Sequence, residues 1–149
     1  MTAIAWDYPN PFTVDVTVAE EDIDGLNHAN NAVYVKWCEM AGWAHSCHLG
    51  LDIEAYRALD RAMAIQKAEY EYLQASLLND ELRVATWITE SDGKLSMIRR
   101  FQIVRASDAA TVLRGQWKVV CIEMSSGRPR RMPAEFRDGY GAVLVDSGE

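Results

Sequence analysis

The spacing of apolar residues divides the chain into a strand, a long helix and a second group of strands. Residues 12–18 (FTVDVTV) alternate between apolar and polar side chains, which is typical of a strand with one buried face. From 31 to 50 the apolar positions recur at helical spacing and cover most of the circumference. Lys36, Glu39 and Ser46 are its polar surface. The pattern predicts a central helix that ends at Gly50.

Four more strands are predicted between residues 63 and 124, at 63–75, 81–91, 94–106 and 111–124. The turns between them are shorter than a parallel return requires, so each strand is expected to pair antiparallel with the next, as a meander. Pro133 favours a short helix near the end. This order predicts an α+β fold in which an antiparallel sheet wraps around one long helix.

Length and composition indicate a soluble chain. At 149 residues, positions 1–149 fit a single domain with its own core. The three cysteines are an odd number without the paired spacing of a zinc site, and no apolar run is long enough to span a bilayer. We therefore expect a cytoplasmic protein without disulfides.

Charge and hydropathy bear on the partners. The net charge of −7 argues against nucleic acid and membrane surfaces as partners, since both favour basic proteins. The one dense basic run, GRPRR, is either a local anion site or a solvated turn; it contains Arg128, Arg130 and Arg131. Apolar residues make up 49% of the chain and include five tryptophans, which fits burial at subunit contacts and predicts a homo-oligomer.

The segment 22–37, DIDGLNHANNAVYVKW, carries more polar groups than a helix entry needs, because one capping side chain satisfies only one or two free N–H groups. Asp24 alone could serve as a cap for the turn at Gly25. The surplus, which includes His28 and three asparagines, indicates chemistry at the start of the predicted helix.

The order of elements and two segments of the chain resemble the hotdog-fold acyl-CoA thioesterases related to 4-hydroxybenzoyl-CoA thioesterase. The two segments are DIDGLNHANNAVYVKWCEMA (22–41) and AEYEYLQASLLNDELRVATW (68–87). The resemblance runs from about residue 12 to 133, with the short helix after it. It implies hydrolysis of a fatty-acyl or aryl thioester of coenzyme A, with no metal and no organic cofactor, because coenzyme A enters as part of the substrate. It also implies a dimer or tetramer with sites between subunits.

The resemblance assigns the catalytic carboxylate to Asp24, acting as general base or as nucleophile. Asp24 and His28 also match the D-x-N-x-H spacing of plant acyl-carrier-protein thioesterases, but Leu26 replaces the middle asparagine. Asn27 and Asn31 are the two candidate substitutes. The free N–H groups at the helix start are suited to polarise the thioester carbonyl; they belong to Asn31, Ala32 and Val33.

Substrate binding is expected at Asn27, Tyr34 and the basic run, whose guanidinium groups match phosphate geometry. Arg99 and Arg100 are weaker candidates for phosphate, and as neighbours on a strand they must face opposite sides. Glu39 is the reserve catalytic residue, because some hotdog enzymes carry their acid on the long helix. His45, His48 and Asp52 could share one face, although histidines are favoured in a last helical turn in any case.

Two other functions remain open from the sequence. A dehydratase acting on a hydroxyacyl thioester would need a histidine and a carboxylate to meet, for which His28 and Glu39 are available. A noncatalytic acyl-thioester-binding module is the other alternative. The acidic charge favours coenzyme A over an acidic carrier protein as the thiol carrier. The sequence does not determine the acyl group.

Overall fold

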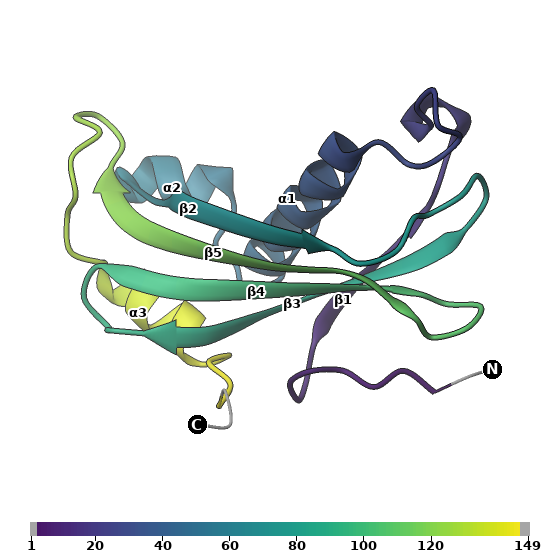
Figure 1. Cartoon of the computed structure of the whole chain (residues 1–149). Coiled ribbons are helices and arrows are strands. Elements are labelled where there is room, and N and C mark those ends of the chain that lie inside the picture. The colour runs from purple at the N-terminus through teal and green to yellow at the C-terminus, as the bar shows by residue number, and fades with distance from the viewer. Residues whose placement is uncertain (1–2, 147–149) are drawn as a thin grey trace.

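The computed structural model describes residues 3–146. They form one five-stranded antiparallel sheet with helices on one face (Figure 1). The strands are β1 (Phe12–Thr17), β2 (Arg61–Tyr72), β3 (Glu81–Ser91), β4 (Ser96–Arg105) and β5 (Thr111–Glu123). The helices are the short 3-10 turn η1 (Glu20–Asp22), the long α1 (Asn31–His48), α2 (Ile53–Leu59) and α3 (Ala134–Gly141).

The predicted meander is confirmed for β3, β4 and β5, whereas the predicted pairing of β2 with β3 is wrong. The sheet order is β1-β3-β4-β5-β2, so β2 pairs with β5 at one edge instead of with β3. β1 takes the place beside β3. The connection 73–80 can span up to about 26 Å when extended, whereas three strand spacings need only about 14 Å. A connection of this length therefore does not decide which strand β2 joins.

Helix α1 begins and ends with the expected signals. The Asn30 side chain caps its start by accepting a hydrogen bond from the Ala32 amide at 2.9 Å. Gly50 follows its end with a φ of +80°, a conformation that favours glycine. Ser46, expected on the polar surface, is buried instead because its hydroxyl pairs with that of Tyr140 at 2.8 Å.

Helices α2 and α3 close one end of the space between α1 and the sheet. The ring of Tyr56 in α2 lies 4.8 Å from that of Phe136 in α3, and Tyr140 in α3 reaches Ser46 in α1. Helix α2 was not predicted from the sequence; the Asp52 side chain caps it by accepting from the Ala55 amide. Across residues 3–146, every helix is too short or too polar to cross a membrane.

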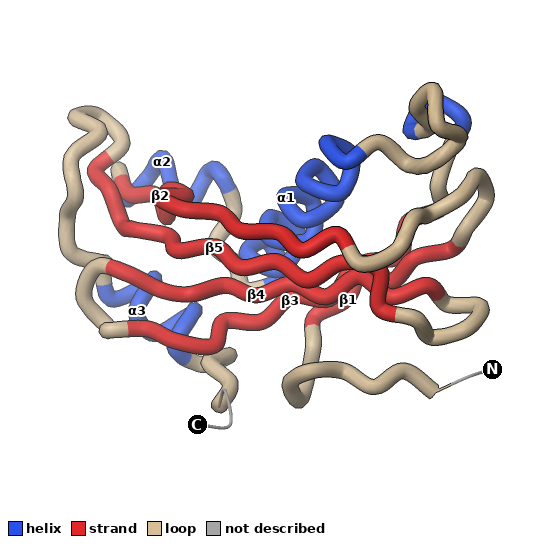
Figure 2. The backbone as a smooth tube through the Cα atoms, viewed as in Figure 1, coloured by secondary structure: helices blue, strands red, loops and turns tan. Residues whose placement is uncertain are grey.

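The opposite face of the sheet is partly covered by the segment before β1 (Figure 2). Tyr8 packs edge-on against the Trp87 ring at 5.3 Å, and the Trp87 indole donates to the Pro9 carbonyl at 3.0 Å. Asp7 forms an ion pair with Arg114 of β5 at 2.7 Å. Trp87 and the outer face are thus shielded by residues that the sequence pattern left unassigned.

Candidate active site

A tight turn at 24–28 fixes the predicted catalytic carboxylate. Oδ1 of Asp24 accepts a hydrogen bond from the Leu26 amide at 2.8 Å and a longer one from the His28 amide at 3.4 Å. The Asp24 amide donates to the His28 carbonyl at 2.9 Å. Oδ2 has no hydrogen-bond partner among the described residues. One carboxylate oxygen therefore orients the group while the other remains available for chemistry.

The turn opens onto a groove between the start of α1 and the end of β2. Asp24, His28, Asn30 and Asn31 line one side of this groove, and residues 72–75 line the other. Asn27 does not line it; it is exposed and has a φ of 62°, which asparagine tolerates better than most residues. Of the two substitutes for the missing motif asparagine, Asn31 is the one that lines the groove together with Asp24 and His28.

Fewer donors are free at the helix start than the sequence predicted. The Ala32 amide donates to the Asn30 side chain and the Val33 amide donates to the Asn30 carbonyl, each at 2.9 Å. Both N–H groups are therefore already satisfied. The Asn31 amide has no acceptor among the described residues. The predicted oxyanion site is thus reduced to this one amide and whatever the Asn31 side chain adds.

Tyr34 is buried at the groove and is held by hydrogen bonds to Ser76. Its side chain is 2% exposed, and its hydroxyl donates to the Ser76 hydroxyl at 2.9 Å while accepting from the Ser76 amide at 3.1 Å. The Ser76 carbonyl accepts in turn from the Ala29 amide at 2.8 Å. These bonds tie the connection 73–80 to α1 and to the segment that follows the turn at 24–28. Tyr34 also lines the groove, so its role in substrate binding stays a prediction.

A second cavity lies between α1 and the sheet. Its rim includes the exposed residues Glu39, Trp43 and Ile65, and its inner end is lined by buried residues of α1, α2, α3 and β4. Glu39 is eight residues after Asn31, which is about 12 Å along a helix. Within one chain, the structure therefore does not bring Glu39 into the groove that contains His28.

Arg99 and Arg100 face opposite sides of β4, as strand alternation predicts. Arg99 lines the cavity beneath α1, whereas the Arg100 guanidinium lies over the Tyr8 ring on the outer face. His45 stacks on Phe12 and contacts Arg99, while Asp52 caps α2. Within residues 3–146, no group of histidine, cysteine and acidic side chains is arranged to hold a metal ion.

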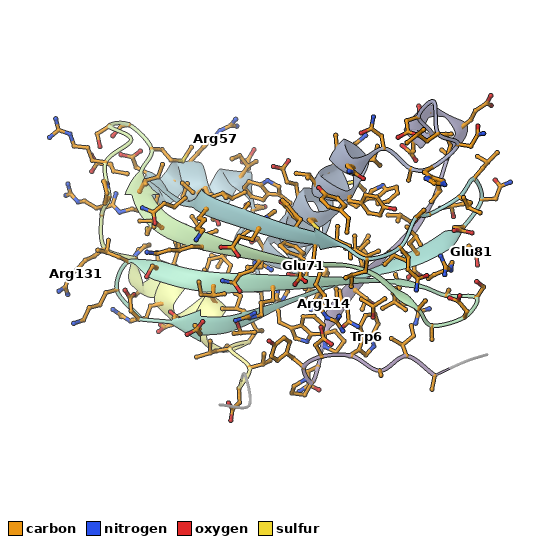
Figure 3. The ribbon with its side chains drawn as sticks, in the orientation of Figure 1. Trp6, Arg57, Glu71, Glu81, Arg114 and Arg131 are labelled. Atoms are coloured by element: carbon orange, nitrogen blue, oxygen red, sulfur yellow. The ribbon has the colours of Figure 1, made fainter. Side chains whose placement is uncertain are left out.

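The arginines of the basic run are far from the groove in the same chain. Arg130 forms an ion pair with Glu123 at 3.1 Å, and its amide donates to Cys121. Cys121 and Glu123 pair with the beginning of β2, while the groove is at its end. A strand of this length spans roughly 35 Å. Figure 3 shows Arg131 at one end of the sheet and Glu81, which follows the groove-lining connection, at the other.

An antiparallel sheet wrapped around one long helix, with a polar turn leading into that helix, defines a hotdog-fold protein. The family model described as the thioesterase-like superfamily matches residues 18–139, and the chain belongs to this superfamily.

The chain is 29% identical over 103 residues to protein THEM6 of Danio rerio, an alignment that covers 58% of this chain and 50% of the relative. The chain thus spans about half the length of the curated relative that it matches.

Two solved structures show the shared fold. One is Slr0204, a 1,4-dihydroxy-2-naphthoyl-CoA thioesterase from Synechocystis, with a TM-score of 0.79 and 20% identity, covering 89% of this chain and 96% of that one. The other is SAV2348 from Staphylococcus aureus in complex with CoA, with a TM-score of 0.82 and 19% identity, covering 95% and 90%.

Proposed function

We propose that this protein hydrolyses acyl-CoA thioesters, with Asp24 as the catalytic carboxylate. One observation carries the proposal: a carboxylate held by its own turn keeps one oxygen free, in a groove that it shares with the open Asn31 amide. An oriented base or nucleophile beside a free N–H donor is the minimum that acyl transfer needs. His28, whose ring has no hydrogen-bond partner among the described residues, lies in the same groove.

The reaction can follow two routes from this arrangement. As general base, Asp24 takes a proton from water, whose oxygen attacks the carbonyl carbon. As nucleophile, Asp24 attacks that carbon itself and forms a mixed anhydride, which water then cleaves. In both routes the Asn31 amide stabilises the oxyanion, the C–S bond breaks, and His28 is placed to protonate the departing thiolate. An acyl adduct on Asp24, sought by mass spectrometry after rapid quenching, distinguishes the two. Neither route uses a metal or an organic cofactor.

The active form in this proposal is a homodimer or a tetramer built from such dimers. β2 is a twelve-residue edge strand, and an uncovered edge of this length is a ready site for pairing. Large apolar side chains are exposed along it and along the adjoining flank of α1: Ile65, Tyr72, Met40 and Trp43 are each 44–45% exposed. Pairing of β2 with its copy about a twofold axis would cover these side chains.

Twofold pairing also explains why the basic run is remote from the groove in one chain. In an antiparallel β2 pair, the end of one strand lies beside the beginning of the other. The groove of one subunit would then lie near the partner's cavity rim at Ile65 and near the partner's arginine run. We assign the thioester to the groove, the acyl group to the partner's cavity, and the coenzyme A phosphates to Arg128, Arg130 and Arg131 of the partner.

Release of free thiol from a panel of acyl-CoAs tests the function. Thioesterase activity predicts release that is proportional to enzyme, whereas a hydroxyacyl dehydratase would change the acyl group without freeing thiol. A binding module would retain acyl-CoA without turnover. Absence of release across short, long and aromatic acyl-CoAs, in a folded preparation, would reject the proposal.

A further inference from the structure

The inner end of the cavity beneath α1 holds a buried positive charge with no negative partner. The Arg99 side chain extends from β4 into this cavity, and the residue is 5% exposed. Its Nη1 group donates to Nδ1 of His45 and to the Thr86 hydroxyl, each at 3.0 Å. None of the ion pairs found within residues 3–146 includes Arg99.

Both groups that accept from Arg99 are neutral at physiological pH. Burial, with the nearby charges of Arg99 and His48, lowers the pKa of His45 to about 4, so its imidazole is uncharged and Nδ1 can accept. Thr86 has only a hydroxyl. The charge of Arg99 is therefore solvated by two hydrogen bonds but not balanced. Taking an ion out of water in this way costs free energy that a bound counterion can recover.

The remaining donors of Arg99 are open to the cavity. Nε and Nη2 of Arg99 donate to no described residue. They are not fully buried either, because among the described residues the one fully buried side-chain polar atom without a hydrogen bond is Nε of Arg61. The hydroxyls of Ser46, Tyr56 and Tyr140 line the same inner end and hydrogen-bond to one another. Burial raises the pKa of both tyrosines, which keeps them protonated and able to donate.

The walls between the rim and this polar end are apolar, and the space is small. They include Met63, Met97, Trp117 and Val119. The cavity measures about 160 Å³, close to the roughly 150 Å³ of an engineered cavity that holds benzene. The carboxylate that lines the cavity, Glu39, is on the rim, seven residues and roughly 10 Å along α1 from Ser46. The cavity thus fits a short chain or one ring that ends in an anionic oxygen.

We propose that the acyl group of the preferred substrate carries a carboxylate at its far end, and that Arg99 is the residue that selects it. This inference rests on the proposed thioesterase function. A distal carboxylate would accept from Nε and Nη2 of Arg99 and from the adjacent hydroxyls. A purely hydrocarbon acyl group of the same length would leave the guanidinium without a counterion and would displace water from it, which disfavours binding of that group.

Turnover of glutaryl-CoA and pentanoyl-CoA by the wild-type protein tests this selection, because these acyl groups share a five-carbon backbone and differ in the terminal carboxylate. We expect kcat/KM to favour glutaryl-CoA by about 10- to 100-fold, the range for a hydrogen-bonded charge. Arg99→Gln should remove most of this preference by lowering the glutaryl-CoA value alone. Arg100→Gln, a neighbour on the outer face, should retain it. 4-Hydroxybenzoyl-CoA and benzoyl-CoA form a second pair, which tests whether a neutral hydroxyl at the far end of the acyl group is preferred instead of a carboxylate.

Free glutarate gives a readout that does not depend on catalysis. It should raise the melting temperature of the wild type and of Arg100→Gln but not of Arg99→Gln, while 1,5-pentanediol, an uncharged compound with the same five-carbon chain, raises none. If Arg99→Gln fails to fold, Tyr140→Phe, which removes one donor, should weaken glutarate binding instead. Equal turnover of the glutaryl and pentanoyl thioesters would overturn the inference and leave the thioesterase function standing. So would preference for a neutral hydroxyl. Glutarate binding without thiol release would reject the function and retain the anion site.

Discussion

The carboxylate of Asp24 accepts a hydrogen bond from the backbone amide of Leu26 at 2.8 Å, inside a turn that the same residue closes through its backbone. The side chain therefore has a structural role and a candidate chemical role at once. An amide side chain can fill the first role but not the second, because it accepts a hydrogen bond through its oxygen and carries no negative charge.

Asp24→Asn is therefore expected to keep the fold and lose the activity. We expect kcat to fall by at least about a hundredfold, the scale of losing a positioned acid or base, with the melting temperature nearly unchanged. Asp22→Asn is the matched control, because the Asp22 carboxylate only accepts from the Ala19 amide at 2.9 Å. Full turnover by Asp24→Asn, or inactivity that follows from unfolding, would return Asp24 to a capping role and direct the search to Glu39.

His28→Ala should cost less than the Asp24 substitution. We expect kcat to fall by about 10- to 100-fold if His28 protonates the thiolate or orients water. Because the ring has no hydrogen-bond partner in the described structure, stability should not change. His48→Ala is the matched control, because it removes an exposed histidine in the last turn of α1, away from the groove. If kcat of His28→Ala equals that of the wild type at every pH measured, His28 takes no part in the mechanism.

The basic run is expected to act on binding and not on chemistry. Combining Arg128→Ala with Arg130→Ala should raise KM for acyl-CoA and leave kcat nearly unchanged, because contacts remote from the thioester stabilise ground and transition states alike. The effect should be smaller with a pantetheine thioester that lacks the nucleotide. Arg83→Ala is the control, since it removes an exposed arginine beside β1 at the other edge of the sheet. Equal effects on both substrates would show that the run is structural.

Activity should depend on the oligomer. Met40 is 44% exposed on α1 and lines neither the groove nor the cavity, so Met40→Glu should place a charge in the proposed interface without altering either. We expect a monomer by light scattering, native circular dichroism, and loss of thiol release. Thr13→Glu adds the same charge to the exposed face of β1 and should remain an active oligomer. A wild-type monomer with full activity at micromolar concentration would disprove the shared site.

Stability should fall in acid partly because of His45. Its pKa in the folded protein, about 4, lies below the usual 6.5, so between these pH values the unfolded chain binds a proton that the folded chain does not. The contribution is fully present above pH 6.5 and is lost as the pH falls toward 4, by about 1.4 kcal/mol per pH unit. Urea unfolding of His45→Gln at pH 5 and pH 7 should show a smaller pH dependence than the wild type. Identical slopes would refute the assignment.

Local features of the molecule were predictable from the sequence. The boundaries of β3 and the start of α1 follow from burial patterns and capping residues that act over a few neighbours. Asp24, His28 and Asn31 share one groove largely because only seven positions separate the first from the last. Short sequence separation and a turn determine such a cluster, whichever strands pair elsewhere.

The tertiary structure decided everything that depends on competition between distant segments. β2 lies at the sheet edge because the two sides of β3 are taken by β1 and β4. Arg99 shows the same limit: alternation predicted that it faces away from Arg100, but not which face the helices cover. The periodicity of the sequence predicts only that a side chain is buried. The charges and hydroxyls around Arg99 are determined by the packing of α1, α2, α3 and β4 against one another.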